Sequence, residues 1–166
     1  GDHIYRRREI CPILESAGMF KAAQTLTADG RYLVFSQLDP VTQRDLWILP
    51  LTGGAPRPYL NSRFEEWRCD VSPDGNWAAY ESNESGRTEV YIQSFPTPGR
   101  KVQVSTTGGA VPYWQSGGRE LAYTTPQGRI MIAPVRSGVD LEVEAPVELG
   151  PFPDDVRGGD VTSDGQ

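Results

Sequence analysis

Histidine and cysteine are scarce in this chain of 166 residues, which has one histidine, His3, and two cysteines, Cys11 and Cys69. Protein zinc sites draw their ligands mainly from these two residue types, so we expect no zinc site. A Ser-His-Asp triad would have to place its base at His3, near the chain end, which argues against one. The cysteines have no metal or redox spacing and fit small buried hydrophobes; a disulfide between them stays open.

Several other signals of chemistry are also missing. No apolar run approaches the ~18 residues that cross a bilayer, so no membrane insertion is expected. The sequence contains no Gly-x-Ser-x-Gly elbow, no phosphate-binding loop and no dinucleotide fingerprint. We therefore expect no cofactor, no metal and no catalytic residues, and interpret the chain as a protein that is not an enzyme.

Positive charge is in deficit. Asp and Glu number 22 against 16 Lys and Arg, giving a net charge of -6. An acidic surface repels phosphate backbones, so a nucleic-acid partner is not expected. The one basic cluster, Arg6–Arg8, fits a solvated terminal segment.

Glycine and proline, by contrast, are plentiful, with 18 and 14 residues. Both residues favour turns and disfavour the interior of helices. Frequent turns between short apolar segments are typical of an all-β fold.

An internal repeat is the most informative feature of the sequence. Three segments align with one another, and a fourth begins near the end of the chain: Thr27–Phe35, Ser72–Tyr80, Gln115–Tyr123 and Thr162–Gly165. The final glycines of their turns are 45, 43 and 47 residues apart. A period of about 40–50 residues made of strands and turns predicts the four-stranded blades of a β-propeller.

Each repeat has a tight turn followed by a buried strand. The turn pairs are Asp29-Gly30, Asp74-Gly75, Gly117-Gly118 and Asp164-Gly165. An Asp side chain accepts hydrogen bonds from nearby backbone N–H groups, and glycine tolerates positive φ. The apolar segments after the turns, such as Trp77–Tyr80, predict strands that are buried on both faces.

The repeat divides the chain into about three blades with a loose strand at each end. A terminal overhang covers residues 1–9, and the outer strand of a preceding blade covers 10–14. The blades themselves cover about 20–60, 67–105 and 111–149, and the outer strand of the third is expected near 146–149. The inner strand of a further blade covers 156–163.

The second repeat carries a family resemblance. Ser72–Ile92, with the pattern SPDGNWAAYESNESGRTEVYI, resembles the TolB-type (WD-repeat-like) β-propeller repeat, and Asp45–Gly54 is similar to its second half. Such repeats occur in TolB-like proteins, in prolyl-oligopeptidase-type enzymes and in C-terminal regions of bacterial serine/threonine kinases. The resemblance implies a non-catalytic binding or scaffold module, or alternatively a sensor or gating propeller of such a kinase or peptidase. It also implies a periplasmic or extracellular location.

About three blades do not close a ring of ordinary size, so the fold is interpreted as half of a six-bladed propeller. Self-association into a homodimer would close the ring, and further blades of a longer chain are the other possibility.

Propellers bind protein partners or small ligands at the channel mouth, where the sequence places Trp67, Arg68, Asp70 and Tyr113. Trp67 is expected in a loop, whereas Trp114 is expected in the packing between blades.

Overall fold

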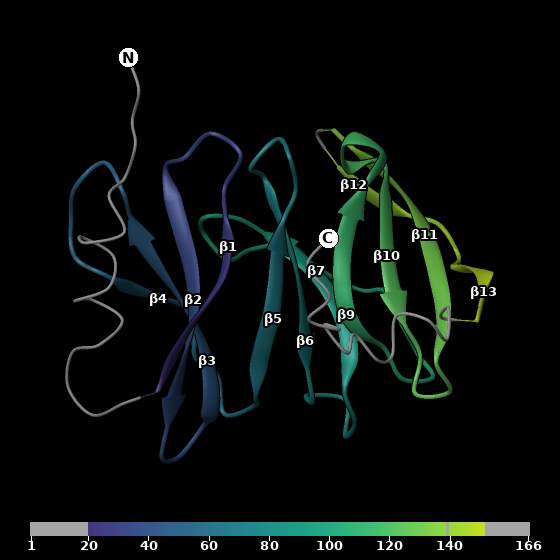
Figure 1. Ribbon diagram of the computed structural model, residues 1–166, viewed down its shortest axis with the longest axis horizontal. Coiled ribbons are helices and arrows are strands. Elements are labelled where there is room, and N and C mark those ends of the chain that lie inside the picture. The colour runs from purple at the N-terminus through teal and green to yellow at the C-terminus, as the bar shows by residue number, and fades with distance from the viewer. Residues whose placement is uncertain (1–19, 139, 152–166) are drawn as a thin grey trace, which may run out of the picture.

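The computed structural model describes residues 20–138 and 140–151, and this part of the chain is built from β-strands (Figure 1). Its single helical element is a short 3₁₀ turn at Ser116–Gly118. Within these residues no helix has the length and apolar character to cross a membrane. The expected all-β fold class is confirmed for the described residues.

The first two sheets have the same topology, with four antiparallel strands in sequence order. The first sheet consists of β1 (Lys21–Leu26), β2 (Tyr32–Asp39), β3 (Gln43–Pro50) and β4 (Arg57–Leu60). The second consists of β5 (Glu66–Val71), β6 (Trp77–Ser82), β7 (Glu89–Ser94) and β8 (Lys101–Gln103). Every residue of β6 is buried: the apolar segment Trp77–Tyr80, as predicted, and also the polar Glu81 and Ser82 that follow it.

The third sheet has the outer strand expected near 146–149, as β13, and a further outer strand, β12, that was not expected. It contains β9 (Ala110–Gln115), β10 (Glu120–Thr124), β11 (Arg129–Ser137), β12 (Leu141–Val143) and β13 (Val147–Pro151). The second half of β11 pairs with β12 and its first half pairs with β13. Two strands share this outer edge because β11, with nine residues, is longer than either of them. Pro146 lies between β12 and β13 and separates them, because proline has no N–H to donate to a neighbouring strand.

The predicted turns join the first and second strands of the sheets. The N–H of Arg31 donates to Asp29 Oδ1 at 3.0 Å, and the N–H of Asn76 donates to Asp74 Oδ1 at 3.1 Å. Gly30 and Gly75 adopt φ of 71° and 75°. In the third sheet, Gly117 and Gly118 both have positive φ, and a 3₁₀ turn replaces the Asp hydrogen bond.

Some predictions concern residues outside the described part of the chain. These are the overhang at 1–9, the strands at 10–14 and 156–163, the turn at Asp164-Gly165, and Cys11. Cys69 is a buried free cysteine.

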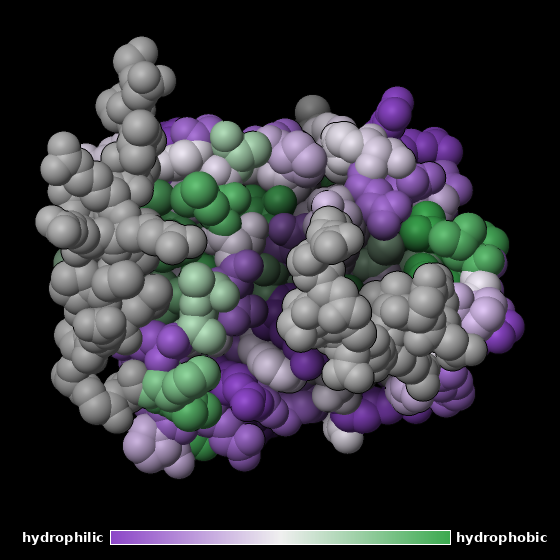
Figure 2. Space-filling view, viewed as in Figure 1, coloured by the Kyte–Doolittle hydropathy of each residue, from purple (hydrophilic) through white to green (hydrophobic). Residues whose placement is uncertain are grey.

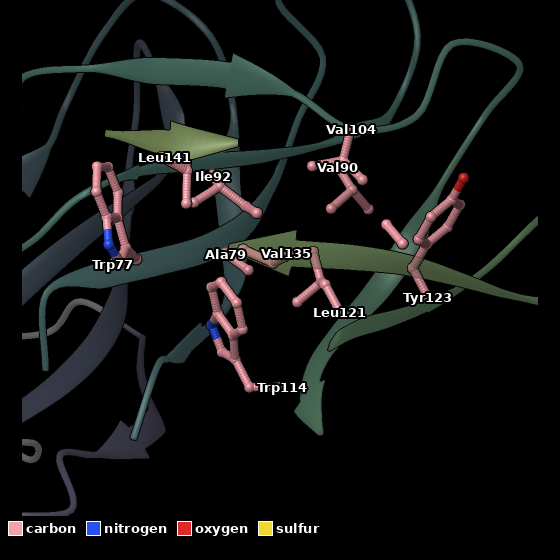
Figure 3. Packing of buried hydrophobic residues seen from close by; sticks show 11 residues of the cluster. Trp77, Ala79, Val90, Ile92, Val104, Trp114, Leu121, Tyr123, Val135 and Leu141 are labelled. Atoms are coloured by element: carbon pink, nitrogen blue, oxygen red, sulfur yellow. The ribbon is translucent and has the colours of Figure 1, made fainter. Parts of the chain in front are cut away.

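The sheets pack face to face, and their first strands β1, β5 and β9 contact one another in succession (Figure 1). Val34, Ile48, Tyr80 and Tyr91 belong to the apolar cluster between the first and second sheets. Between the second and third sheets, Trp77 and Ile92 meet Trp114, Leu121 and their neighbours (Figure 3). We call β1, β5 and β9 the inner strands.

Candidate functional site

The three inner strands share a β-bulge at equivalent positions of the repeat. Pairing with the neighbouring strand shifts by one residue between Ala23 and Thr25, between Trp67 and Asp70, and between Ala110 and Tyr113. A bulge inserts an extra residue into one strand and redirects its side chains. We define the inner-strand surface as the exposed side chains of β1, β5 and β9. Because the bulge recurs on all three strands, this surface is the candidate site.

Two bulged residues have left-handed backbone conformations. Arg68 has φ of 47° and Val111 has φ of 52°, and they lie 43 residues apart, as Gly75 and Gly118 do. Positive φ is unusual for any residue with a side chain and is a real outlier for β-branched valine. Glu81 holds both residues: its carboxylate accepts the Val111 N–H at 2.6 Å and pairs with the Arg68 guanidinium at 3.3 Å.

Replacing Val111 by asparagine is expected to raise the free energy of unfolding by about 0.5–1 kcal/mol, because asparagine adopts this conformation at lower cost. The Val111 side chain is half exposed, so little packing is lost. Val111→Thr, which remains β-branched, is the control and should bring no such gain. Urea denaturation of the three proteins provides the measurement, and equal stability of the Asn and Thr variants would contradict the presence of strain.

Trp67 contacts two arginine side chains. It is part of β5, which corrects the expectation that it occupies a loop; the bulge lets the strand continue through this residue. The guanidinium carbons of Arg44 and Arg68 lie 4.3 Å and 4.1 Å from the centre of a Trp67 ring. Such cation–π contacts fix the indole in place.

The charges of the two arginines are compensated by neighbouring carboxylates. Arg44 pairs with Glu65, and Arg68 pairs with Glu81. Trp67 and Arg68 were predicted from the sequence. Arg44, Glu65 and Glu81 were not, because they come from other strands and connections. The arrangement presents an ordered aromatic and cationic group, with partial charge compensation, on the inner-strand surface.

Asp70 connects all three inner strands. Its carboxylate accepts the Trp114 N–H at 2.9 Å and the Thr25 hydroxyl at 3.3 Å, and its carbonyl accepts the Trp114 indole N–H at 3.2 Å. Burial raises the pKa of Asp70, although these hydrogen bonds oppose the shift. Asp70 therefore has a structural role in joining the sheets, whatever further contact it makes.

Tyr113 and Trp114 point to opposite faces of the third sheet. Trp114 is buried, in agreement with its expected packing role, whereas Tyr113 is 60% exposed. On the Tyr113 face, a shallow pocket of about 210 Å³ is lined by Val111, Tyr113, Gln115, Ala122, Tyr123, Thr124 and Ile130. Figure 2 shows hydrophobic residues over the first sheet and toward the edge of the third, with hydrophilic residues between them.

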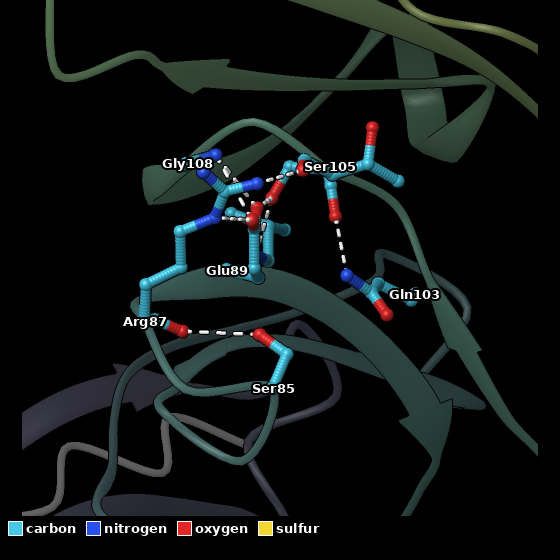
Figure 4. Close-up of polar contacts among 8 residues, drawn as sticks. Ser85, Arg87, Glu89, Gln103, Ser105 and Gly108 are labelled. Carbon is cyan, nitrogen blue, oxygen red and sulfur yellow. Dashed lines mark hydrogen bonds and ion pairs between the residues drawn. The ribbon is translucent and has the colours of Figure 1, made fainter.

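A buried carboxylate joins the second sheet to the connection that leads into the third sheet (Figure 4). Glu89 is 1% exposed, and its two oxygens accept the Gly108 N–H at 2.9 Å and 3.0 Å. The Ser105 hydroxyl also donates to Glu89, and the Arg87 guanidinium pairs with it at 2.7 Å. Glu89 was not predicted to be an important residue. Its position at the start of the repeated strand was the only feature of the sequence that pointed to it.

Chains of known structure share this arrangement. A putative TolB from Agrobacterium tumefaciens aligns with a TM-score of 0.60 and 13% identity, over 82% of this chain and 52% of that chain. TolB from Acinetobacter baumannii aligns with a TM-score of 0.59 and 18% identity, over 81% of this chain and 36% of that one. A chain from a structural study of two prolyl endopeptidases aligns with a TM-score of 0.51 and 15% identity, over 81% of this chain and 21% of that chain.

These similarities support a TolB-like β-propeller fold. Sequence identities this low support an inference about the fold and not about function. No family model matches the sequence, and no curated protein matches it either. The chain spans about half and about a third of the two TolB chains.

Proposed function

We propose that this chain is a TolB-like propeller segment that acts as a non-catalytic binding or scaffold module. The observation that carries the proposal is the repeated bulge of the inner strands, which positions Trp67 and Arg68 on the inner-strand surface, whereas Tyr113 shares the outer face of the third sheet with Ile130. Aromatic residues and arginine are enriched in protein interfaces and contribute much of their binding energy. Asp70 holds the strands that carry them.

Binding is tested with a pull-down from a lysate of the source organism. Immobilised wild-type protein is compared with a Trp67→Ala/Arg68→Ala variant and with Val41→Ser, a control at a residue that is 87% exposed. We expect a partner to be retained by the wild type and by Val41→Ser and lost from the double variant. Retention of the same proteins by all three would contradict a role for the inner-strand surface.

We further propose that the outer face of the third sheet, around Ile130, packs against more propeller blades. Ring closure removes exposed sheet faces and edges. A second copy of the chain is the proposed source, giving a six-bladed homodimer. Light scattering coupled to size-exclusion chromatography should then give twice the chain mass of 18.3 kDa, and Ile130→Asp should give a monomer. A soluble wild-type monomer at micromolar concentration would contradict self-association.

One observation favours a second candidate, a sensor or gating propeller within a longer kinase or prolyl-oligopeptidase-type peptidase. The aligned residues amount to 21% of the prolyl endopeptidase chain, which leaves room there for other domains. The reading frame around this sequence distinguishes the candidates, because only the second requires a catalytic domain in the same polypeptide.

A further inference from the structure

The first and second sheets carry an acidic residue at the same position of the repeat. Asp45 precedes the buried part of β3, as Glu89 begins β7. The connections to the next inner strand also correspond: Ser62 and Ser105 each lie ten residues before the turn residues Ser72 and Gln115. The two seams between sheets are thus built from equivalent positions, which makes their differences informative.

The main difference is a glutamate in place of a glycine. Gly109 lies beside Ser105, where an added Cβ would come within 2.7 Å of the Ser105 Cβ, so this seam has no space for a side chain. Glu66 occupies the equivalent position in the other seam, six residues before Ser72. There the Ser62 hydroxyl donates to Glu66, whereas Ser105 donates to Glu89.

Two buried carboxylates are consequently left incompletely bonded. Asp45 is 5% exposed and Glu66 is 3% exposed. Asp45 Oδ2 accepts the Thr42 hydroxyl at 3.0 Å, but buried Asp45 Oδ1 and buried Glu66 Oε2 accept no hydrogen bond from the residues that the structure describes. Glu89 accepts hydrogen bonds from Gly108 and Ser105 and pairs with Arg87, whereas Asp45 and Glu66 each accept one side-chain hydroxyl.

Protein cations do not compensate these two charges. Within residues 20–138 and 140–151, neither Asp45 nor Glu66 forms an ion pair, and the adjacent Arg44 pairs with Glu65. Burial raises the pKa of Glu66 to about 7. The Ser62 hydrogen bond opposes this shift, and repulsion from Asp45 adds to it. Burial also raises the pKa of Asp45. Close buried carboxylates favour either a shared proton or a bound cation.

We propose that Asp45 and Glu66, together with the hydroxyls of Thr42 and Ser62, bind a divalent cation of the hard class, with Ca²⁺ as the preferred ion. These donors are all oxygen atoms, and Ca²⁺ tolerates the irregular geometry of ligands contributed by strands and connections. Backbone carbonyls and water supply the remaining ligands of such sites. The cation joins the first sheet to the connection that leads into the second, at the position equivalent to the one where Glu89 and its partners join the second sheet to the connection that leads into the third.

The test uses terbium luminescence on the full chain after treatment with EDTA. Tb³⁺ replaces Ca²⁺ in oxygen sites, and Trp67, adjacent to Glu66 in sequence, sensitises its emission. We expect saturable emission that Ca²⁺ displaces, with at least tenfold weaker binding to Glu66→Gln and to Asp45→Asn. The control is Glu148→Gln, which removes the exposed carboxylate that pairs with Arg129 on the third sheet and should leave binding unchanged.

Folding of the variants is checked by circular dichroism and thermal unfolding without metal. Glu66→Gln should then be at least as stable as the wild type, because it removes a buried charge. Ca²⁺ should raise the Tm of the wild type and leave that of Glu66→Gln unchanged. Absence of saturable emission, wild-type affinity in Glu66→Gln, or a wild-type Tm that responds to pH but not to Ca²⁺ would each overturn the proposal.

Discussion

Glu89→Ala is expected to lower the free energy of unfolding by about 2–5 kcal/mol, because two buried donors lose their acceptor at about 1–3 kcal/mol each. The substitution leaves the buried Gly108 N–H and Ser105 hydroxyl without their acceptor and removes the partner of Arg87. Unsatisfied donors lose their hydration without compensation. Because these groups join β7 to the connection that leads into β9, the loss falls on the seam between two sheets.

The control for this prediction is another Arg–Glu pair in the same chain. Arg129 and Glu148 pair at the surface with side chains that are 44% and 46% exposed, so Glu148→Ala should cost at most about 1 kcal/mol. Glu89→Gln, which retains an acceptor oxygen and similar volume, should fall between the two. Urea denaturation gives the three values, and equal losses for Glu89→Ala and Glu148→Ala would contradict the structural role of Glu89.

Trp114→Ala is expected to cost a similar amount, about 3–5 kcal/mol, because it opens a large cavity in the core. The indole is 6% exposed and packs in the cluster between the second and third sheets (Figure 3). Its N–H also donates to the Asp70 carbonyl, so the substitution removes a contact between inner strands. Differential scanning calorimetry or urea denaturation would measure the loss.

The neighbouring residue on the same strand provides a matched control. Tyr113 points away from the core and is largely exposed, so Tyr113→Ala should change stability by no more than about 0.5 kcal/mol. If the two alanine variants were equally stable, the orientation of β9 would have to be reversed, since a shift of one residue exchanges the two faces of a strand.

The local structure of the sheets could be predicted from short segments of sequence. Asp29-Gly30 and Asp74-Gly75 form their turns through contacts within a few residues, and the apolar run Trp77–Tyr80 is buried as its composition indicates. The expectation failed at β12, where Leu141–Val143 was not recognised as a strand. That strand depends on the exposed edge of β11, a property of the sheet that its own three residues do not reveal.

The candidate site could be predicted only in part. Trp67, Arg68, Asp70 and Tyr113 follow from the position of the inner strands in the repeat. The partners of these residues are far away in sequence: Arg44 lies against Trp67, and Thr25 and Trp114 donate to Asp70. Cation–π contacts and hydrogen bonds between sheets have no fixed sequence spacing, so the pattern did not indicate them.

By itself, the sequence determined that this protein forms short antiparallel strands with a recurring turn, because turn chemistry and apolar periodicity act over a few residues. Only the tertiary structure decided which buried carboxylates are satisfied. Glu89 and Asp45 occupy equivalent repeat positions. Their surroundings differ because Gly109 lies near the first and Glu66 occupies the equivalent position near the second. The energy of a buried charge depends on all the groups packed around it, and in this chain those groups come from separate sheets.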